Sequence, residues 1–542
     1  MVDDSTMSPN HGNSSTEAMG PTSRRGILKS AAIMTIMTLL SRILGLVREQ
    51  VRGYYLGTGT GADAFGLGST LPNLFRRLLA EGAMTAAFVP VLTGYARKEN
   101  RQELVDFLSS FLTLLTFVAT LICLLGIVFA GWIVPTFFPG FGAVEGKLAL
   151  TVVITQITFP YLLLVTVAAL IQAVLNTFGR FAPSAFTPVL LNLSIILCAF
   201  LLHDAFPDPS YAFALGFVIG GFLQLVFQLP WFFRTGIRLK LSFNWRHPGV
   251  RELVRIFIPG AFAAGIYQIN VFVSEMIASS LSEGSIAALG YSIRLQELIL
   301  GVFVISITTV ILPALSAQHA NNDREGYGKT ILLALDSLAL VTVPAAFGLI
   351  AVREPLLHLL FQQGAFDQDS TRITGLAVLF HSMGVYFIAT SRSLNQAFYA
   401  MKDLKTPMIV SAVAMVVNVA GCYLLAGPLA HGGIALANSL SAAVTGLLLF
   451  VILLRRAPDV PLLSHLSLLL RVILASGVMF LVLDRLVAYV PLAPDAGKLR
   501  QLELVLLYCA VGIVVFLAAG MLLLKKEFAQ LVRVMLRRKR KQ

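Results

Sequence analysis

Charged residues are scarce in this chain. Of its 542 residues, 13% are Asp, Glu, Lys or Arg, whereas 57% are hydrophobic. Soluble domains carry about 25% charged residues, so this composition excludes an ordinary soluble protein. It indicates an integral membrane protein with many spans.

Cysteines are also few. The four of them (Cys123, Cys198, Cys422 and Cys509) all lie within apolar segments, and no two show C-x-x-C spacing. This pattern argues against a disulfide framework or a zinc site, and it is typical of small core residues.

Enzyme motifs are missing as well. The sequence has no H-E-x-x-H motif, no Cys/His cluster and no D-D-x-x-D-type run. Residues 328–330 resemble the end of a P-loop, but Asp323 stands where that motif requires its first glycine. The G-x-G-x-G run that begins at Gly57 is too short for a dinucleotide fingerprint, and we interpret it as a flexible turn. We therefore expect no catalytic activity, cofactor or metal, and an ion gradient or the membrane potential as the energy source.

Long apolar segments dominate what is present. A membrane-spanning helix needs about 20 mostly apolar residues. We expect an all-α polytopic membrane protein with about fourteen transmembrane helices, at roughly 27–51, 64–92, 106–134, 148–175, 184–203, 211–232, 252–280, 286–316, 330–352, 371–400, 407–426, 432–454, 465–490 and 501–524.

Lys and Arg residues gather in alternate connections between these segments. Cytoplasmic loops carry an excess of them, so the pattern predicts that both termini are cytoplasmic. Residues 1–26 then form a disordered cytoplasmic tail, and residues 527–542 form a basic one. That basic tail suits anionic lipid, and because no nucleic-acid-binding motif accompanies it, we expect no nucleic-acid partner. The connections on the predicted cytoplasmic side contain Arg24, Arg25, Lys29, Arg97, Lys98, Arg101, Arg180, Arg234, Arg238, Lys240, Arg246, Arg251, Arg324, Lys329, Lys402, Lys405, Arg455 and Arg456.

A weak internal repeat divides the chain. A shift of 224 residues places Gln172-Ala173 on Gln396-Ala397 and Pro183 on Pro407. The repeat predicts two six-helix lobes, at 27–250 and 251–460, around a central cavity. The last two spans, within 461–526, lie outside the repeat. This organisation favours an alternating-access transporter.

Ionisable residues stand out in the first two spans and in the eighth. Such groups are costly at membrane depth and by default mark a binding site or a pathway. Arginine binds phosphate through a planar fork, so arginines that converge from both lobes predict a site for a polyanion of diphosphate size. The candidates for substrate binding are Arg42, Arg48, Arg76 and Arg294, and the acidic residues that would orient them are Glu49, Asp63, Glu81 and Glu297. Gly45, Pro72 and Asn73 mark points where a helix could break around a ligand.

Some of these charges have simpler interpretations. For Arg52, Arg77 and Glu275 we favour ion pairing or snorkelling at a helix end. Asp336, His381 and Arg392 are lone polar residues that helix–helix packing explains. We therefore do not include these six residues in the predicted substrate site.

Several motifs resemble those of the MurJ (MviN) lipid II flippases, in the multidrug, oligosaccharidyl-lipid and polysaccharide (MOP) exporter superfamily. They are S-R-I-L-G-L-V-R-E at 41–49, A-D-A-F at 62–65, L-P-N-L-F-R-R-L-L-A-E-G-A at 71–83 and A-F-V-P-V-L at 87–92. Supporting matches lie at 176–181, 291–297, 311–316 and 360–366. The resemblance covers the chain from about residue 27.

The resemblance implies a function and a location. The family moves lipid II, an undecaprenyl-diphosphate-linked disaccharide-peptide, from the cytoplasmic to the outer leaflet of the bacterial cytoplasmic (inner) membrane for cell-wall synthesis. Its partners would be lipid II, membrane lipids and cell-wall synthesis proteins. The last two spans would line a groove for the lipid tail. Thr70 stands where some relatives have lysine, and nothing assigns a role to the long polar N-terminus.

The resemblance also assigns residues. The family's key arginines fall on Arg42, Arg48, Arg76 and Arg294, and its acidic partners fall on Glu49, Asp63 and Glu81.

Other functions remain open at this stage. The chain could export another polyprenyl-diphosphate glycan, or act as a drug/cation antiporter, although we expect acidic rather than arginine-rich residues in the cavity of an antiporter. A membrane-embedded enzyme acting on polyprenyl diphosphates would also use arginines, but it would require a metal-binding acidic cluster.

Overall fold

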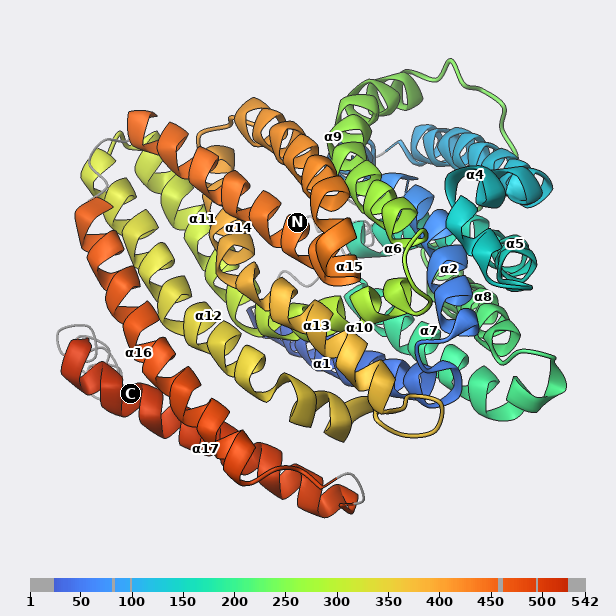
Figure 1. Ribbon diagram of the computed structural model, residues 1–542. Helices are drawn as coiled ribbons and strands as arrows, with labels where there is room; N and C mark the ends of the chain where they lie inside the picture. The colour runs from blue at the N-terminus through green and yellow to red at the C-terminus, as the bar shows by residue number, and fades with distance from the viewer. Residues whose placement is uncertain (1–23, 80–82, 98–99, 457–461, 494–495, 525–542) are drawn as a thin grey trace, which may run out of the picture.

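The computed structural model describes residues 24–79, 83–97, 100–456, 462–493 and 496–524, and every regular element within them is a helix (Figure 1). The first elements are α1 (Arg24–Leu56), α2 (Thr60–Leu79), α3 (Ala83–Arg97), α4 (Arg101–Phe137), η1 (Pro139–Ala143), α5 (Lys147–Thr158), α6 (Pro160–Thr177), α7 (Phe181–Leu202), η2 (His203–Ala205) and α8 (Ser210–Phe233). The remaining elements are α9 (Pro248–Ala278), α10 (Ser285–Ile299), the π-helix η3 (Leu300–Val304), α11 (Ile305–Ala320), α12 (Arg324–Phe361), α13 (Gln368–Met383), α14 (Val385–Ala400), α15 (Lys405–Arg456), α16 (Leu462–Tyr489) and α17 (Lys498–Leu523).

The predicted all-α organisation is confirmed, and each predicted span coincides with one helix, with part of α15, or with consecutive helices. Ala430, with φ of 49°, kinks α15 and so separates two spans. Eight described helices are long and apolar enough to cross a membrane, or nine if the bent pair α13–α14 is one span. The charged helices α1, α2 and α10 are not among the eight.

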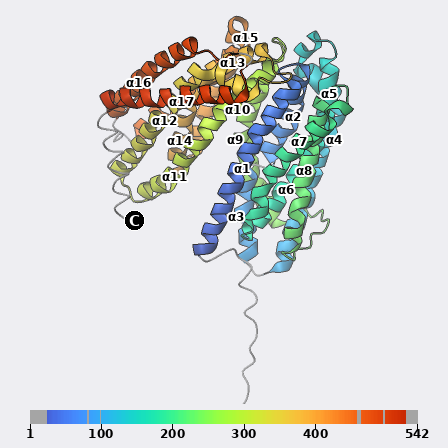
Figure 2. The ribbon, with the colours of Figure 1, turned by 90° about the horizontal axis from the view of Figure 1, so that it is seen from below.

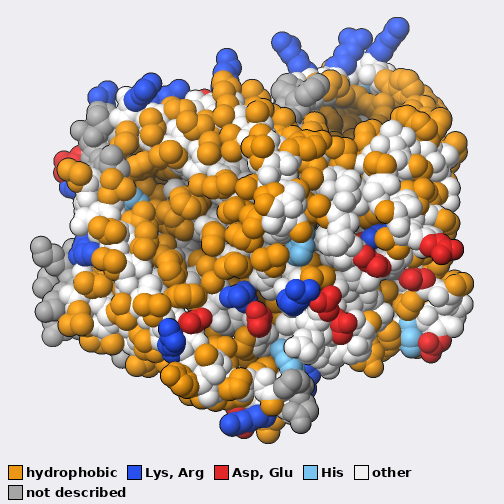
Figure 3. Space-filling model, viewed as in Figure 1, with side chains coloured by type: hydrophobic (Ala, Val, Ile, Leu, Met, Phe, Trp, Pro, Cys, Tyr) orange, Lys and Arg blue, Asp and Glu red, His pale blue; other side chains and the backbone are white. Residues whose placement is uncertain are grey.

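The surface is that of a multi-pass membrane protein. Large hydrophobic side chains are exposed on α4, α7, α15, α16 and α17, and they cover most of the middle of the face in Figure 3. Lys and Arg side chains project at one end of that view. The connection between α8 and α9 carries four exposed ones, namely Arg234, Arg238, Lys240 and Arg246, and Arg251 is exposed in the first turn of α9.

The helices form two bundles, the lobes, with α1–α8 in the first and α10–α15 in the second. Figure 2 shows the lobes meeting near α2, α10 and α13 and diverging toward the start of α1 and the end of α11. Helix α9 links them: Val250 and Leu253 belong to the same core as Phe107 of the first lobe, while α9 also packs on α15. Helices α16 and α17 pack on α12, at the edge of the second lobe.

The expected helix breaks are not found where the sequence suggested them. Helix α1 runs unbroken through Gly45, and α2 runs unbroken through Pro72 and Asn73. Pro72 has no N–H to donate to the Gly68 carbonyl, but the Thr158 hydroxyl of α5 donates to that oxygen at 2.6 Å. This contact from a neighbouring helix lets α2 continue.

Helix interruptions occur elsewhere. Helices α5 and α6 meet at Phe159, α13 and α14 meet at Gly384 with a bend of 43°, and the π-helix η3 interrupts the eighth span. The predicted tails lie outside the described residues, except that α1 already begins at Arg24.

Candidate functional site

A buried carboxylate organises the charged residues of the first span. The Glu49 side chain on α1 is 5% exposed, and Arg48 Nη2 donates to its Oε1 at 2.5 Å. Arg52 Nη1, three residues further along the same helix, lies 3.5 Å from Glu49 Oε2. Glu49 thus lies between two guanidinium groups of its own helix.

A third guanidinium reaches Glu49 from the second lobe. Arg294 on α10 places its Nε 3.5 Å from Glu49 Oε1, while its side chain stays 56% exposed. We call Arg48, Glu49, Arg52 and Arg294 the arginine cluster. Three guanidinium groups around one carboxylate leave the cluster positively charged. It lies where the two lobes meet, and its most exposed member belongs to the second lobe.

Neighbouring residues hold the two α1 arginines in place. Arg48 Nη1 donates to Asn192 Oδ1 of α7 at 3.0 Å, and Asn192 Nδ2 donates back to the Ser41 carbonyl at 3.1 Å. Arg52 Nη2 donates to the Ala62 carbonyl at 2.9 Å, and its guanidinium lies over the Tyr291 ring. These contacts fix Arg48 and Arg52, which are 19% and 12% exposed, more firmly than Arg294.

The other two predicted arginines lie nearby but bind differently. The Arg42 guanidinium lies so close to Gly301 in η3 that a side chain there would collide with it. Arg76 stays on α2, where its Nε donates to Asn73 Oδ1 at 2.9 Å. Arg42 therefore touches the second lobe, as Arg294 touches the first.

The acidic residues divide among different roles. Glu297 does not orient the cluster, because Arg392 Nη2 of α14 lies 2.8 Å from its Oε1 and faces it instead. Arg392 is accordingly not the lone polar residue that the sequence suggested. Glu81 lies outside the described residues.

Asp63 joins the lobes at one end of the molecule. Its Oδ2 accepts from Lys147 Nζ of α5 at 2.7 Å and from the Gly284 backbone N–H at 2.8 Å, and its Oδ1 accepts from the Ala287 N–H at 2.8 Å. Gly284 and Ala287 form the start of α10, so a first-lobe carboxylate caps a second-lobe helix whose N-terminus carries partial positive charge. Both charged side chains are almost fully buried.

More contacts surround Asp63, and together they form what we call the junction: residues 54–63 with residues 283–291 and 363–370. The Tyr291 hydroxyl donates to the Gly57 carbonyl at 3.0 Å, and the Ala365 N–H donates to the Tyr54 carbonyl at 2.8 Å. Gly57, with φ of 54°, packs so closely on the Ala365 carbonyl that no side chain fits. The glycine run is thus a packed interface rather than the flexible turn we expected.

Two site residues had no clear signal in the sequence. In the sequence, Lys147 lies in a predicted connection between two spans, where a lysine is ordinary. Its partner Asp63 is far from it along the chain. Asn192 lies within an apolar helix, where an isolated amide is the only available hint. In the structure their burial identifies them: Lys147 is 3% exposed and Asn192 is 6% exposed.

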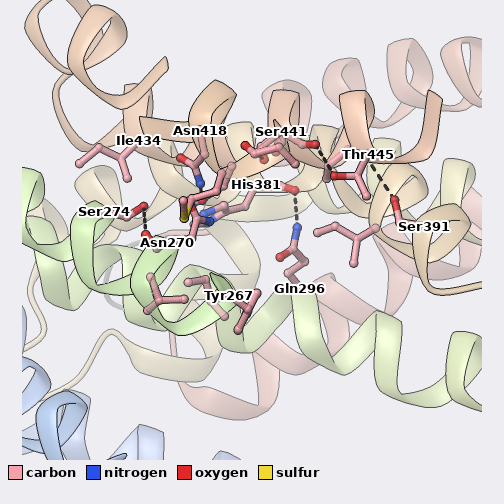
Figure 4. Close-up of a pocket in the computed structure, with 18 of the residues that line it drawn as sticks. Tyr267, Asn270, Ser274, Gln296, His381, Ser391, Asn418, Ile434, Ser441 and Thr445 are labelled. Atoms are coloured by element: carbon pink, nitrogen blue, oxygen red, sulfur yellow. Dashed lines mark hydrogen bonds between the residues drawn. The ribbon is translucent and has the colours of Figure 1, made fainter. Parts of the chain in front are cut away.

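A cavity lies in the second lobe, beside the cluster. It is lined by residues of α9, α10, α13, α14 and α15, among them Tyr267, Gln296 and His381 (Figure 4). Both partners of the Glu297–Arg392 pair also line it. Among the described residues, no group of three or more His, Cys, Asp or Glu side chains could hold a metal ion. The three guanidinium groups of the arginine cluster suit an anionic ligand.

Known proteins resemble this chain over most of its length. Residues 53–494 match the family model "Lipid II flippase MurJ". A "Probable lipid II flippase MurJ" of Vibrio cholerae is 37% identical over 431 residues, which cover 78% of this chain and 82% of that protein. The "Lipid II flippase MurJ" of Burkholderia cenocepacia is 31% identical, over 78% of this chain and 84% of that protein.

Solved structures show the same architecture. One titled "Lipid II flippase MurJ, inward closed conformation" superposes with a TM-score of 0.76 and 25% identity, over 92% of this chain and all of that one. An inward-facing multidrug transporter of the MOP superfamily matches with a TM-score of 0.66 but 12% identity, over 79% of this chain and 98% of that one, and so shares the fold. Because the family model covers most of its length, this chain belongs to the lipid II flippase MurJ family.

Proposed function

We propose that this protein moves lipid II from the cytoplasmic to the outer leaflet of the bacterial cytoplasmic membrane by alternating access. Membership of the family supports lipid II as the substrate. The observation that carries the proposal is the arginine cluster, in which Arg48 and Arg294 reach the same carboxylate from different lobes. A diphosphate between them would touch both lobes.

The substrate diphosphate would compete with Glu49 for the guanidinium groups. Arg294 is the group best able to turn, because it is half exposed and lies 3.5 Å from Glu49. Arg48, held by Asn192, would provide a fixed point. Two planar forks can bind the oxygens of a diphosphate in pairs, and Glu49 keeps the empty site from repelling itself. Protein groups bind and release the substrate in this scheme and form no bond with it, so we propose a transporter and not an enzyme.

The junction would be the outer gate. We place both termini in the cytoplasm, because the exposed Arg and Lys of the α8–α9 connection lie at the end away from the junction. With the junction closed, the lobes diverge toward the cytoplasm (Figure 2). Binding that draws Arg48 and Arg294 together would favour the state in which the junction is open.

Helices α16 and α17 would hold the lipid tail. Their exposed leucines, among them Leu466, Leu470 and Leu506, would face the acyl environment beside α12. The head group would then cross between the lobes while the polyprenyl chain stays in the bilayer. Surrounding lipids are partners in this scheme, and cell-wall synthesis proteins would consume the product.

Depletion and rescue in cells test the proposal. Lipid II exposed at the outer leaflet is measured after depletion of this protein and again after expression of wild type, Arg48→Ala or Arg372→Ala. Arg372 is a matched control, because it is an exposed arginine paired with Asp369 on its own helix. We expect rescue by wild type and by Arg372→Ala only. Rescue by Arg48→Ala would show that transport does not need the arginine cluster. If wild type is inserted in the membrane but does not rescue, the assignment of lipid II as the substrate is contradicted.

A further inference from the structure

The second-lobe cavity has a volume of about 460 Å³, within the range of small-molecule sites. Amide and hydroxyl side chains from four helices line it. Figure 4 shows several of them around the open space, and the set includes Asn270, Ser274, Gln296, Ser391, Asn395 and Asn418. A wall of this kind binds ligands through hydrogen bonds rather than through charge.

Two amide oxygens in this wall lack hydrogen-bond partners. Asn270 Oδ1 on α9 and Asn395 Oδ1 on α14 are buried and accept no hydrogen bond from the protein. Buried polar atoms are nearly always paired, so an unpaired acceptor in a cavity needs an explanation. A ligand that brings O–H or N–H donors would supply it once each amide turns its shielded oxygen toward the cavity.

The residues that line the cavity carry no excess of positive charge. Glu297 and Arg392, which both line it, form an ion pair at 2.8 Å. The remaining lining residues that carry hydrogen-bonding groups are amides, hydroxyls and His381, apart from Glu275, which accepts a hydrogen bond from Thr70. This balance favours a neutral polar ligand over a phosphate or an acidic peptide.

Helix α10 is a wall shared by the cavity and the arginine cluster. Gly290, Ile293 and Glu297 line the cavity, and Arg294 lies among them in the sequence. Gly290 also faces Arg52, since a side-chain carbon there would lie 3.9 Å from Arg52 Nη1. A ligand bound at the cluster therefore has its neighbouring group close to the cavity.

We infer that the cavity is a subsite for the sugar attached directly to the diphosphate of the substrate, an inference that rests on the proposed function. An N-acetylated sugar carries hydroxyl and amide N–H donors for Asn270 and Asn395, and it carries no charge. Gly290, Arg294 and Glu297 share one face of α10, so the diphosphate would bind the cluster while this sugar enters the adjoining cavity.

Binding of two lipids to the purified protein tests the subsite. The probes are undecaprenyl diphosphate, which has no sugar, and lipid II. The variant is Asn270→Leu/Asn395→Leu, which keeps the side-chain size and removes both acceptors. Asn176→Leu is the matched control, because Asn176 Oδ1 on α6 is also buried without a partner but lies in the first lobe, outside the cavity.

We expect the double variant to bind lipid II roughly tenfold more weakly, as the loss of two modest hydrogen bonds predicts, and to bind undecaprenyl diphosphate as wild type does. Asn176→Leu should change neither affinity. Unchanged lipid II binding, or an equal loss for both lipids, would overturn the subsite and leave the proposed function standing. If wild type binds neither lipid, the proposed function fails and the subsite fails with it.

Discussion

Arg48 uses different nitrogens for different partners, Glu49 on its own helix and Asn192 on α7. Lysine has the same charge but no planar fork, so it cannot hold both partners and a phosphate together. We predict that Arg48→Lys inserts normally but retains about a tenth of wild-type transport or less, as expected when charge-assisted hydrogen bonds are lost. Lipid II at the outer leaflet measures this, and full activity in Arg48→Lys would show that charge alone suffices.

Glu49 balances the guanidinium groups around it. Removal of one partner of a buried ion pair leaves the others uncompensated, and because Arg294 is half exposed we expect Glu49→Gln to cost about 2 kcal/mol of folding stability. Pyrophosphate should restore part of this loss by taking the place of the carboxylate. Thermal unfolding in detergent checks both effects. A variant that pyrophosphate stabilises no more than wild type would argue against an anion site here.

The residues of this site were only partly predictable. Arg48, Glu49 and Arg294 stood out because charge is rare in apolar segments, and the structure brings them together. The sequence did not predict the Glu297–Arg392 pair, because the two residues lie on different helices. Their spacing along the chain does not say which of their side chains face each other. Lys147 looked like a loop residue for the same reason.

At the scale of the helix, α2 depends on a hydroxyl from another helix. Thr158 donates to the Gly68 carbonyl that Pro72 leaves without a backbone donor. We predict that Thr158→Val destabilises the protein by about 1–3 kcal/mol, the cost of an unpaired buried acceptor. Thr151→Val is the control, since the equally buried Thr151 donates to a carbonyl of its own helix. Equal unfolding temperatures for the two variants would contradict this role of Thr158.

Helix existence was easier to predict than helix shape. Apolar segments predicted where the helices lie, because a segment that crosses a membrane must pair its backbone polar groups within a helix. The interruptions at Phe159, Gly384 and η3 were not anticipated, whereas those expected at Gly45 and Pro72 are absent. Neighbouring helices decide such details, as Thr158 does for Pro72.

At the scale of the whole molecule, Asp63 connects the two lobes at the junction. It accepts hydrogen bonds from Lys147 and from the start of α10. We predict that Asp63→Asn shifts the population toward a junction-open state, since it weakens contacts that the open state lacks. Spin labels at Ala205 and Gln368, in place of these residues and with the native cysteines replaced, report the distance between the lobes there.

The matched control for this shift is Glu503→Gln, whose carboxylate pairs with Arg500 on its own helix, α17, outside the junction. Its distance distribution should equal that of the parent. If Asp63→Asn also leaves the distribution unchanged, the junction is not a gate that Asp63 holds closed.

In the proposed function, guanidinium groups from both lobes carry the lipid II diphosphate across the membrane. The most direct test is transfer of lipid II between the leaflets of liposomes that contain the purified protein, with and without a membrane potential. We predict transfer by wild type, and for Arg294→Ala a rate equal to that of protein-free liposomes. Transfer by Arg294→Ala at the wild-type rate would contradict it.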